Sequence, residues 1–353
     1  MAAKEAWQAL HLKFPDKVPR TEYSAHFHWP LVKEVTGIDA MAEPERRPEA
    51  SSRFVAAWDY GMMWNILVNS NFLEEKGGRT TKMGHAAYQV GGTDFDPTVR
   101  LAFAEPEEAL SVDPCREYGE FDRADLIRRF EDNYRTACGL YPGALNMSGV
   151  YITLFSGLID IFGFEQLLYL IGMYEKEFGK FIDGYAAWIR QFFEAYAATD
   201  IPVMMVHDDL CWTSGPVHHP DWYRRAVFPH IAELIGIVKR AGKKVYFTSD
   251  GTIDEFFDDI AGWGVDAVVM EPTCDIRKFL TRHGNHCGAV GGMDCRDLMS
   301  KSDAEIEREM RDLMAFGKQY PGFMVAVGNH IPNNVPVDKA RLYHRLYEEL
   351  AVR

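Results

Sequence analysis

The sequence lacks the cysteine spacing and the long apolar run that mark several common protein classes. Its six cysteines include no CxxC pair, which argues against a disulfide framework and against a thiolate zinc knuckle. No run of about 18 apolar residues occurs, because the longest candidate, 150–173, is interrupted by Asp160, Glu165 and several glycines. We therefore expect reduced thiols and no membrane-spanning segment.

Positive charge is also scarce. The chain has 52 acidic and 38 basic residues and a net charge of -14, so it repels nucleic-acid phosphates and anionic lipid headgroups. Neither nucleic acid nor a membrane surface is an expected partner. The first residues show no basic segment followed by an apolar run and a small-residue cleavage site, so we expect a cytoplasmic protein.

The composition of the chain is that of a folded globular protein. Of its 353 residues, 47% are hydrophobic and 25% are charged, which allows a large core and argues against disorder. No internal repeat, low-complexity tract or linker rich in Pro, Gly or Ser divides it. We therefore expect a single domain over residues 1–353.

Short β-branched apolar runs alternate with longer amphipathic stretches from about residue 200 onward. This pattern predicts five strands, at 201–207, 243–249, 265–271, 286–292 and 322–329. Each is followed by a predicted helix, at 220–241, 253–263, 276–282, 303–316 and 337–352. Uniformly apolar strands joined by helices are typical of a parallel sheet that is covered on both faces.

The first half of the chain supplies three further candidate strands, at 18–24, 63–69 and 143–149. With the five above they give eight strands, and right-handed crossovers close such a series into a (β/α)₈ TIM barrel. We expect N-terminal helical additions and a hairpin at 79–92, where alternating residues flank a Met-Gly turn near the barrel mouth.

Polar residues that directly follow the apolar runs are the candidates for chemistry, because the C-terminal ends of barrel strands meet at one mouth. They are His207, Asp208, Asp209, Thr248, Ser249, Asp250, Glu271, Asp294, Asn329 and His330. Imidazoles and carboxylates gathered there could bind a divalent metal, or could act as general acid and base. For Asp208, Asp209 and Asp250 the alternative is that they only cap helices or bond backbone amides.

Some histidines and tryptophans lie outside this set. His28 follows the first candidate strand, where a pocket role and a structural role are both open. An aromatic substrate pocket could be lined by Trp29, Trp58, Trp64 and Trp212, although aromatic residues more often lie in the core. The pair His218 and His219 precedes the Pro-Asp start of a helix, which favours a surface or capping role.

The second half of the chain resembles the uroporphyrinogen decarboxylase superfamily, which includes zinc-dependent corrinoid methyltransferases. The segment HDDLCWTSGPVHHPDWYRRAVFPHIAELIGIVKRAGKKV (207–245) is similar to the Asp-rich strand end and Pro-Asp-x-(Tyr/Phe)-Arg helix start of that family. The following strand ends, TSDGTIDEFFDDIAGWGVDAVVMEP, VGGMD and VGNHIPNNVP, also match, as does the opening FPDKVPRTEYS. The resemblance implies a barrel with its pocket at the strand C-termini.

Two departures from family patterns bear on the reaction. The segment TEYSAHFHWP (21–30) has no arginine, whereas decarboxylases of the family use arginines there to hold the carboxylates of a tetrapyrrole. The segment Thr248 to Gly251 replaces the His-x-Cys-Gly of the zinc methyltransferases, and Asn329 and His330 lie near the position of their later cysteine. Any zinc would therefore use oxygen and nitrogen ligands.

With these departures, the resemblance is to the branch that demethylates methoxylated aromatics. It implies that a methyl group moves from a small methylated donor to the cobalt of a corrinoid protein, with zinc as a Lewis acid. The implied metal ligands are Asp250, Glu271 and His330. The implied catalytic residues are His207 and Asp209, and the implied substrate-binding residues are His28, Trp212 and Asp208.

Other functions remain open from the sequence. The same carboxylates could manage protons in a metal-free decarboxylase or lyase of the uroporphyrinogen decarboxylase type. A barrel without activity that only binds a corrinoid protein or a small ligand is a further alternative. Relatives are often dimers, so a homodimer is an assembly that the resemblance allows.

Overall fold

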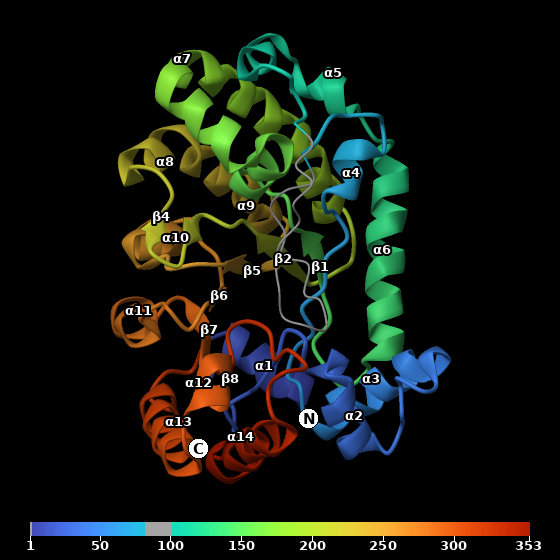
Figure 1. Cartoon of the computed structure of the whole chain (residues 1–353), viewed down its shortest axis with the longest axis vertical. Helices are drawn as coiled ribbons and strands as arrows, with labels where there is room; N and C mark the ends of the chain where they lie inside the picture. The colour runs from blue at the N-terminus through green and yellow to red at the C-terminus, as the bar shows by residue number, and fades with distance from the viewer. Residues whose placement is uncertain (1, 82–100) are drawn as a thin grey trace.

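The computed structural model describes residues 2–81 and 101–353, and it is built around a curved parallel sheet (Figure 1). Six of its strands pair in the order β1-β2-β5-β6-β7-β8, each parallel to the next. Their bounds are β1 Ser148–Val150, β2 Val203–His207, β5 Lys244–Ser249, β6 Ala267–Met270, β7 Gly288–Gly292 and β8 Phe323–Ala326. A separate small ribbon pairs β3, Cys211–Trp212, with β4, Gly215–Pro216.

Two N-terminal segments close this sheet into a barrel. Arg20 forms parallel bridges to Val325 of β8 and to Tyr60, and Met62 forms a parallel bridge to Leu145, just before β1. The segments around residues 20 and 60–68 thus occupy the seventh and eighth strand positions. The (β/α)₈ barrel expected from the sequence is confirmed, although the segments predicted as strands at 18–24 and 63–69 pair through isolated bridges rather than as regular strands.

Helices surround the strands, with α6, α7, α11 and α14 on successive sides in Figure 1. The N-terminal helices are α1 Ala2–Leu10, α2 Trp29–Thr36, α3 Arg47–Ala57, α4 Asn71–Glu74, α5 Pro114–Tyr118 and α6 Arg123–Leu140. The later helices are α7 Phe155–Ala197, α8 Pro220–Ala226, α9 Phe228–Arg240, α10 Phe257–Gly262, α11 Ile276–His283, α12 Cys295–Ser300, α13 Asp303–Gly317 and α14 Val337–Leu350.

The predicted helices after residue 200 are present, with one difference. The helix expected over 220–241 is divided into α8 and α9 at Val227, whose ψ of -53° is helical but whose φ is -117°. Pro229 lies in the first turn of α9, where it cannot donate the backbone hydrogen bond that a continuous helix would need. Most of the hairpin predicted at 79–92 lies outside the described residues.

By length and composition, α7 is apolar enough to cross a membrane, but its surroundings are those of a core helix. Of the most apolar 18-residue stretch of α7, 72% is buried inside the protein. Its backbone also leaves helical geometry at Gly163 and Tyr174, so the segment is a set of kinked helices rather than one rod. The apolar side chains of α7 therefore serve to cover the barrel.

The barrel interior and its outer shell form separate apolar clusters. Inside, side chains such as Met147, Met205 and Tyr246 pack together with Ala6 and Leu10 of α1. The larger cluster lies between the strands and the surrounding helices. This packing fixes the strands on which the polar residues of the mouth are mounted.

A buried carboxyl group links the barrel segment around residue 20 to α14. Glu22 is 1% exposed, and its carboxyl oxygens accept hydrogen bonds from the Val327 N–H at 3.0 Å and the Tyr343 hydroxyl at 2.5 Å. Burial raises the pKa of Glu22 to about 7, although the charge of Arg20 acts to lower it. The folded protein therefore holds this proton more tightly than the unfolded chain does.

Because the folded pKa of Glu22 is raised, its contribution to stability is complete below pH 4.5 and is lost as the pH rises to about 7. We expect Glu22→Gln to remove this loss. The free energy of unfolding of the variant, relative to that of the wild type, should therefore rise by on the order of 2 kcal/mol between pH 5 and pH 7.5. Urea unfolding of both proteins at the two pH values measures the difference. Parallel pH dependence in the two proteins would contradict the assignment.

Candidate active site

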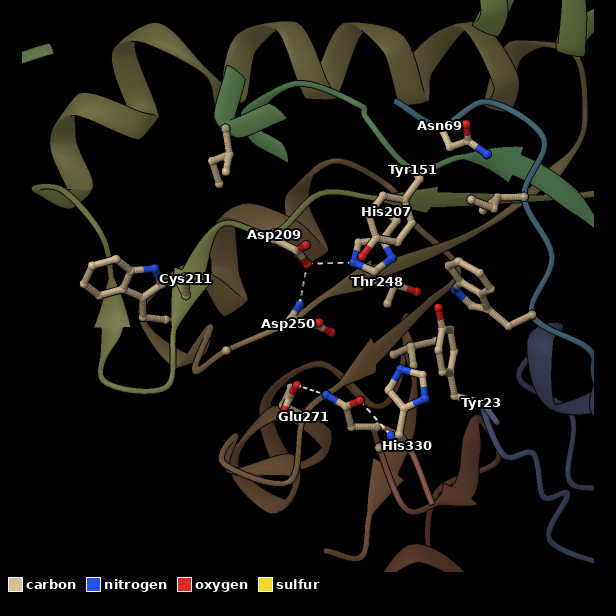
Figure 2. A pocket seen from close by; sticks show the side chains of 18 of the residues that line it. Tyr23, Asn69, Tyr151, His207, Asp209, Cys211, Thr248, Asp250, Glu271 and His330 are labelled. Carbon is tan, nitrogen blue, oxygen red and sulfur yellow. Dashed lines mark hydrogen bonds and ion pairs between the residues drawn. The ribbon is translucent and has the colours of Figure 1, made fainter. Parts of the chain in front are cut away.

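A cavity of about 750 Å³ lies at the mouth of the barrel, among residues at the C-terminal ends of the strands (Figure 2). His207 ends β2, Asp250 directly follows β5, and Glu271 directly follows β6. Tyr151 follows β1, and His330 lies four residues beyond the end of β8. The volume is in the range of sites for small organic ligands.

His207, Asp209 and Asp250 form a compact polar cluster on one side of this cavity (Figure 2). The ring of His207 bonds through Nε2 to Oδ1 of Asp209 at 2.6 Å, and the backbone N–H of Asp250 donates to the same oxygen at 2.9 Å. One ligand atom from each of the three residues lies within 4.8 Å of the others. An imidazole nitrogen and two carboxylate oxygens are donors that zinc accepts in proteins.

The local chain explains why these three side chains meet. β2 and β5 are neighbours in register, with His207 opposite Thr248, so the residues just after both strands lie side by side. After Asp250 the chain turns at Gly251, whose φ of 78° favours glycine. A Cβ atom at Gly251 would lie 2.2 Å from the carbonyl oxygen of Cys211, so glycine permits the close approach of the loop to β3.

The charge of the cluster acts on the buried imidazole. His207 is 2% exposed, and burial alone would lower its pKa, but the charge of Asp209 and the hydrogen bond to it raise the pKa above its usual value. The charges of Asp250 and Asp208 act in the same direction. His207 therefore holds a proton more tightly than a free imidazole does, which suits general acid–base chemistry, and a metal ion bound at this nitrogen would displace that proton.

On the side formed by β6 and β8, Glu271 and His330 have other contacts. The amide Nδ2 of Asn329 donates to Oε1 of Glu271, and burial raises the pKa of this carboxyl group. The ring of His330 packs edge-on against Tyr23 at a centroid distance of 4.4 Å. Burial lowers the pKa of His330 to about 4, so its imidazole is neutral at pH 7.

Of the three metal ligands predicted from the sequence, only Asp250 therefore belongs to the compact cluster. Glu271 and His330 line the same cavity, but they are held by Asn329 and Tyr23 on its β6 and β8 side. The structure favours His207 and Asp209, for which the sequence predicted catalytic roles, as the companions of Asp250.

Aromatic rings form a wall of the cavity beside the cluster. Trp64 packs edge-on against Tyr23, Tyr151 and His207, at centroid distances of 4.7, 6.0 and 5.8 Å. The ring of Tyr151 lies 3.9 Å from that of His207. Trp212, predicted to bind substrate, lines the outer part of the cavity, where it is 48% exposed and packs against Phe164.

Two of the residues predicted to bind substrate do not line the cavity. His28 is the N-cap of α2: its Nδ1 accepts from the Leu31 N–H at 3.1 Å, and Nε2 bonds the Val335 carbonyl oxygen at 2.9 Å. Asp208 is fully buried, does not line the cavity, and bonds backbone N–H groups at the start of α7. The predictions for His28 and Asp208 are corrected to structural roles.

Asp208 holds the N-terminus of α7. Its Oδ2 accepts from the backbone N–H groups of Leu154 and Phe155, both at 3.1 Å, and its Oδ1 accepts from that of Ser156 at 2.6 Å. This is the capping alternative left open by the sequence, applied to the helix that precedes β2. The capping role favoured for His219 is also present, since its Nδ1 accepts from the Asp221 N–H at 3.2 Å.

The sequence analysis missed most of the aromatic wall. Tyr151 directly follows β1, so the strand-end rule used for the second half of the chain would have found it. Trp64 is one of the four tryptophans that the sequence marks as candidates for an aromatic pocket, and it lines the cavity. Tyr23 lies within a predicted strand, where only the alternation of facing directions could have marked it as a lining residue. No sequence signal singles out Phe164, which reaches the cavity from α7.

Apart from two imidazoles, that of His207 bonded to Asp209 and that of neutral His330, the charged side chains that line the described cavity carry carboxylates. They are Asp209, Asp250 and Glu271, and among residues 2–81 and 101–353 no lysine or arginine lines it. The thiol in the wall, Cys211, has its pKa raised by burial, which disfavours a thiolate. The described cavity therefore suits a cation, or a neutral aromatic group, better than an anion.

Comparisons with known proteins agree with this architecture. No curated protein matched the chain. Among solved structures, a methyltransferase from Methanosarcina mazei matches with a TM-score of 0.63 and 13% identity, covering 99% of this chain and 98% of its own. At this identity the likeness shows the fold alone.

Two further solved structures match more weakly. A xylose isomerase domain protein from Planctomyces limnophilus has a TM-score of 0.36 and 10% identity, over 64% of this chain and 83% of its own. The 3-keto-D-glucoside 4-epimerase from E. coli has a TM-score of 0.35 and 14% identity, over 69% of this chain and 90% of its own.

The sequence itself matches one family model, described as uroporphyrinogen decarboxylase (URO-D), over residues 147–350. The matched region runs from just before β1 into α14, and so contains His207, Asp209, Asp250 and Glu271. The chain belongs to the uroporphyrinogen decarboxylase family.

Proposed function

We propose that the protein is a methyltransferase that moves a methyl group from a small methoxylated aromatic compound to the cobalt of a corrinoid. The corrinoid is carried on a partner protein, a zinc ion at the barrel mouth is the Lewis acid, and the reaction takes place in the cytoplasm. The observation that carries the proposal is the cluster of His207, Asp209 and Asp250 beside an aromatic wall. The fold shared with a methyltransferase supports it.

The charge of the cavity argues against decarboxylation of a porphyrinogen. Such a substrate carries several carboxylates, which other proteins bind with arginine. The described cavity offers no arginine or lysine, and three carboxylates of its own face the space. A polyanion would meet repulsion there, whereas a neutral methoxylated ring would not.

The donor set fits zinc. One imidazole and two carboxylates would supply three protein ligands and leave a position open, which is the pattern of catalytic zinc sites. Zinc bound there would supply Lewis acidity at the ether oxygen, on which negative charge develops as the methyl group leaves for reduced cobalt.

The remaining residues of the cavity bind and orient the donor. Tyr23, Trp64 and Tyr151 present ring faces and edges on which the aromatic ring of the donor can pack. His330, whose imidazole is neutral at pH 7, can form a hydrogen bond with a hydroxyl or methoxy substituent of that ring.

Zinc binding tests the proposal directly. We expect protein purified without an affinity tag to contain about one zinc per chain by elemental analysis, or to bind one zinc on titration after chelation. His207→Ala should lose this binding, because it removes the nitrogen donor of the cluster.

His344→Ala is the matched control. Its imidazole lies outside the cavity, stacked on Trp58 at a centroid distance of 5.0 Å, so zinc content should be unchanged. Folded wild-type protein that neither contains zinc nor takes it up would contradict the proposed function. Equal zinc content in the wild type and in His207→Ala would contradict the ligand set.

A further inference from the structure

We propose that the cavity selects methyl donors without negative charge, with Glu271 as the specificity-determining residue, so that methoxylated aromatic amines and alcohols bind and methoxylated aromatic acids are excluded. The inference rests on the proposed function for the reaction, but it concerns the charge of the donor, which binding alone can measure. It follows from the way charge and aromatic surface are divided in the cavity.

Figure 2 shows this division: Asp209, Asp250 and Glu271 lie on one side, and Tyr23, Tyr151 and His330 lie on the other. A donor that fills about 750 Å³ must contact both sides. A ring that packs on the aromatic side therefore presents its substituents toward carboxylates. The net charge of -14 for the whole chain adds to the negative potential.

A bound metal, whose open position can accept an oxygen donor, leaves the charge of Glu271 in place. A divalent cation would cancel the charges of Asp209 and Asp250, but Glu271 stands apart from the metal cluster. Its Oε1 accepts from Asn329, a neutral partner that fixes the carboxyl group without cancelling its charge. Glu271 is therefore the carboxyl group that continues to repel an anionic donor.

Arg296, a cation that acts on Glu271, is already paired with Asp294. Arg296 acts on Glu271 electrostatically, but its Nε and Nη2 donate to Oδ2 of Asp294 at 2.9 and 2.6 Å. Arg296 is not among the residues that line the cavity. Within the described part of the chain, no lysine or arginine is therefore available to receive a carboxylate of the donor, and the imidazole of His207 is already bonded to Asp209.

The aromatic side would add attraction for a cationic substituent. Trp64 and Tyr151 are rings whose faces attract ammonium groups when water is excluded. An amine placed between these rings and Glu271 would be attracted both by the ring faces and by the carboxylate. A neutral alcohol has neither electrostatic attraction but is not repelled. The expected order of affinity, from tightest to weakest, is therefore amine, alcohol, acid.

Three probes of nearly equal shape test this order: 4-methoxybenzylamine, 4-methoxybenzyl alcohol and 4-methoxybenzoate. Titration calorimetry on the purified protein, with and without saturating zinc, gives their affinities. We expect the amine to bind at least about tenfold more tightly than the acid, with the alcohol between, since opposite and like charges a few ångströms apart differ by more than that at a partly buried site. Equal or tighter binding of the acid, or no binding of amine and alcohol, would overturn the proposal.

The role of Glu271 is tested by Glu271→Gln beside the matched control Glu348→Gln, an exposed residue of α14. The first change should reduce the ratio of amine to acid affinity about tenfold or more, and the second should leave it unchanged. An unchanged ratio in Glu271→Gln would exclude it as the determinant. If the order of affinities holds but no methyl transfer is found, the proposed function fails while the charge selectivity stands.

Discussion

Replacing Asp250 with asparagine should remove the bound metal and lower methyl transfer by on the order of 100-fold or more, because a Lewis acid at the reacting oxygen contributes several kcal/mol. Asparagine keeps the size of the side chain but is a poorer ligand than a carboxylate. The Asp250 N–H that donates to Asp209 belongs to the backbone, so the variant retains that contact. Zinc content and the rate of phenol release are to be measured on the same sample.

Asp132→Asn provides the control, since this residue lies on α6 with its side chain 69% exposed and should affect neither quantity. If Asp250→Asn keeps both its zinc and its rate, Asp250 is not a ligand. If it keeps zinc and loses the rate, Asp250 acts on the donor rather than on the metal. Both outcomes would contradict a zinc site formed by His207, Asp209 and Asp250.

Asp208→Ala should destabilise the protein by about 3–5 kcal/mol, because it leaves backbone donors at the start of α7 without an acceptor in a buried site. The carboxylate of Asp208 is fully buried and accepts from the N–H groups of Leu154, Phe155 and Ser156. Guanidinium unfolding followed by far-UV circular dichroism gives the free energy of unfolding.

Asp122→Ala is the comparison for this effect. Asp122 also caps a helix, α6, but at an exposed site and with one hydrogen bond to the Asp125 N–H, so the expected cost is about 1 kcal/mol. Folded Asp208→Ala protein should still bind zinc. Similar small losses for both variants, or selective loss of zinc in Asp208→Ala, would show that Asp208 serves the site rather than the fold.

Much of the fold can be predicted from the sequence, because most barrel strands are short apolar runs and a helix separates each run from the next. The five strands after residue 200 and β1 occupy predicted places, and the two segments predicted as strands at 18–24 and 63–69 lie in the barrel wall through isolated bridges. Regular pairing is shortest in the first half, where Arg20 and Met62 contribute isolated bridges. The break between α8 and α9 could have been predicted from Pro229.

The site was harder to predict, because strand-end position says which residues reach the mouth but not which reach one another. His207 ends β2 and Asp209 follows it, and β2 pairs with β5, which leads into Asp250. Glu271 and His330 follow β6 and β8, so contact with the first group depends on the width of the barrel and on local partners such as Asn329. Strand alternation would have separated Asp208 from His207 and Asp209, which line the cavity.

The most direct test of the central claim is methyl transfer itself. Zinc-loaded protein would be mixed with 4-methoxybenzyl alcohol and chemically reduced cobalamin without oxygen, following the absorbance of the corrinoid and the release of 4-hydroxybenzyl alcohol. The account predicts that the phenol appears in step with loss of the reduced corrinoid, and only when the protein and zinc are both present. Neither change, with a protein that binds zinc and the alcohol, would contradict the account.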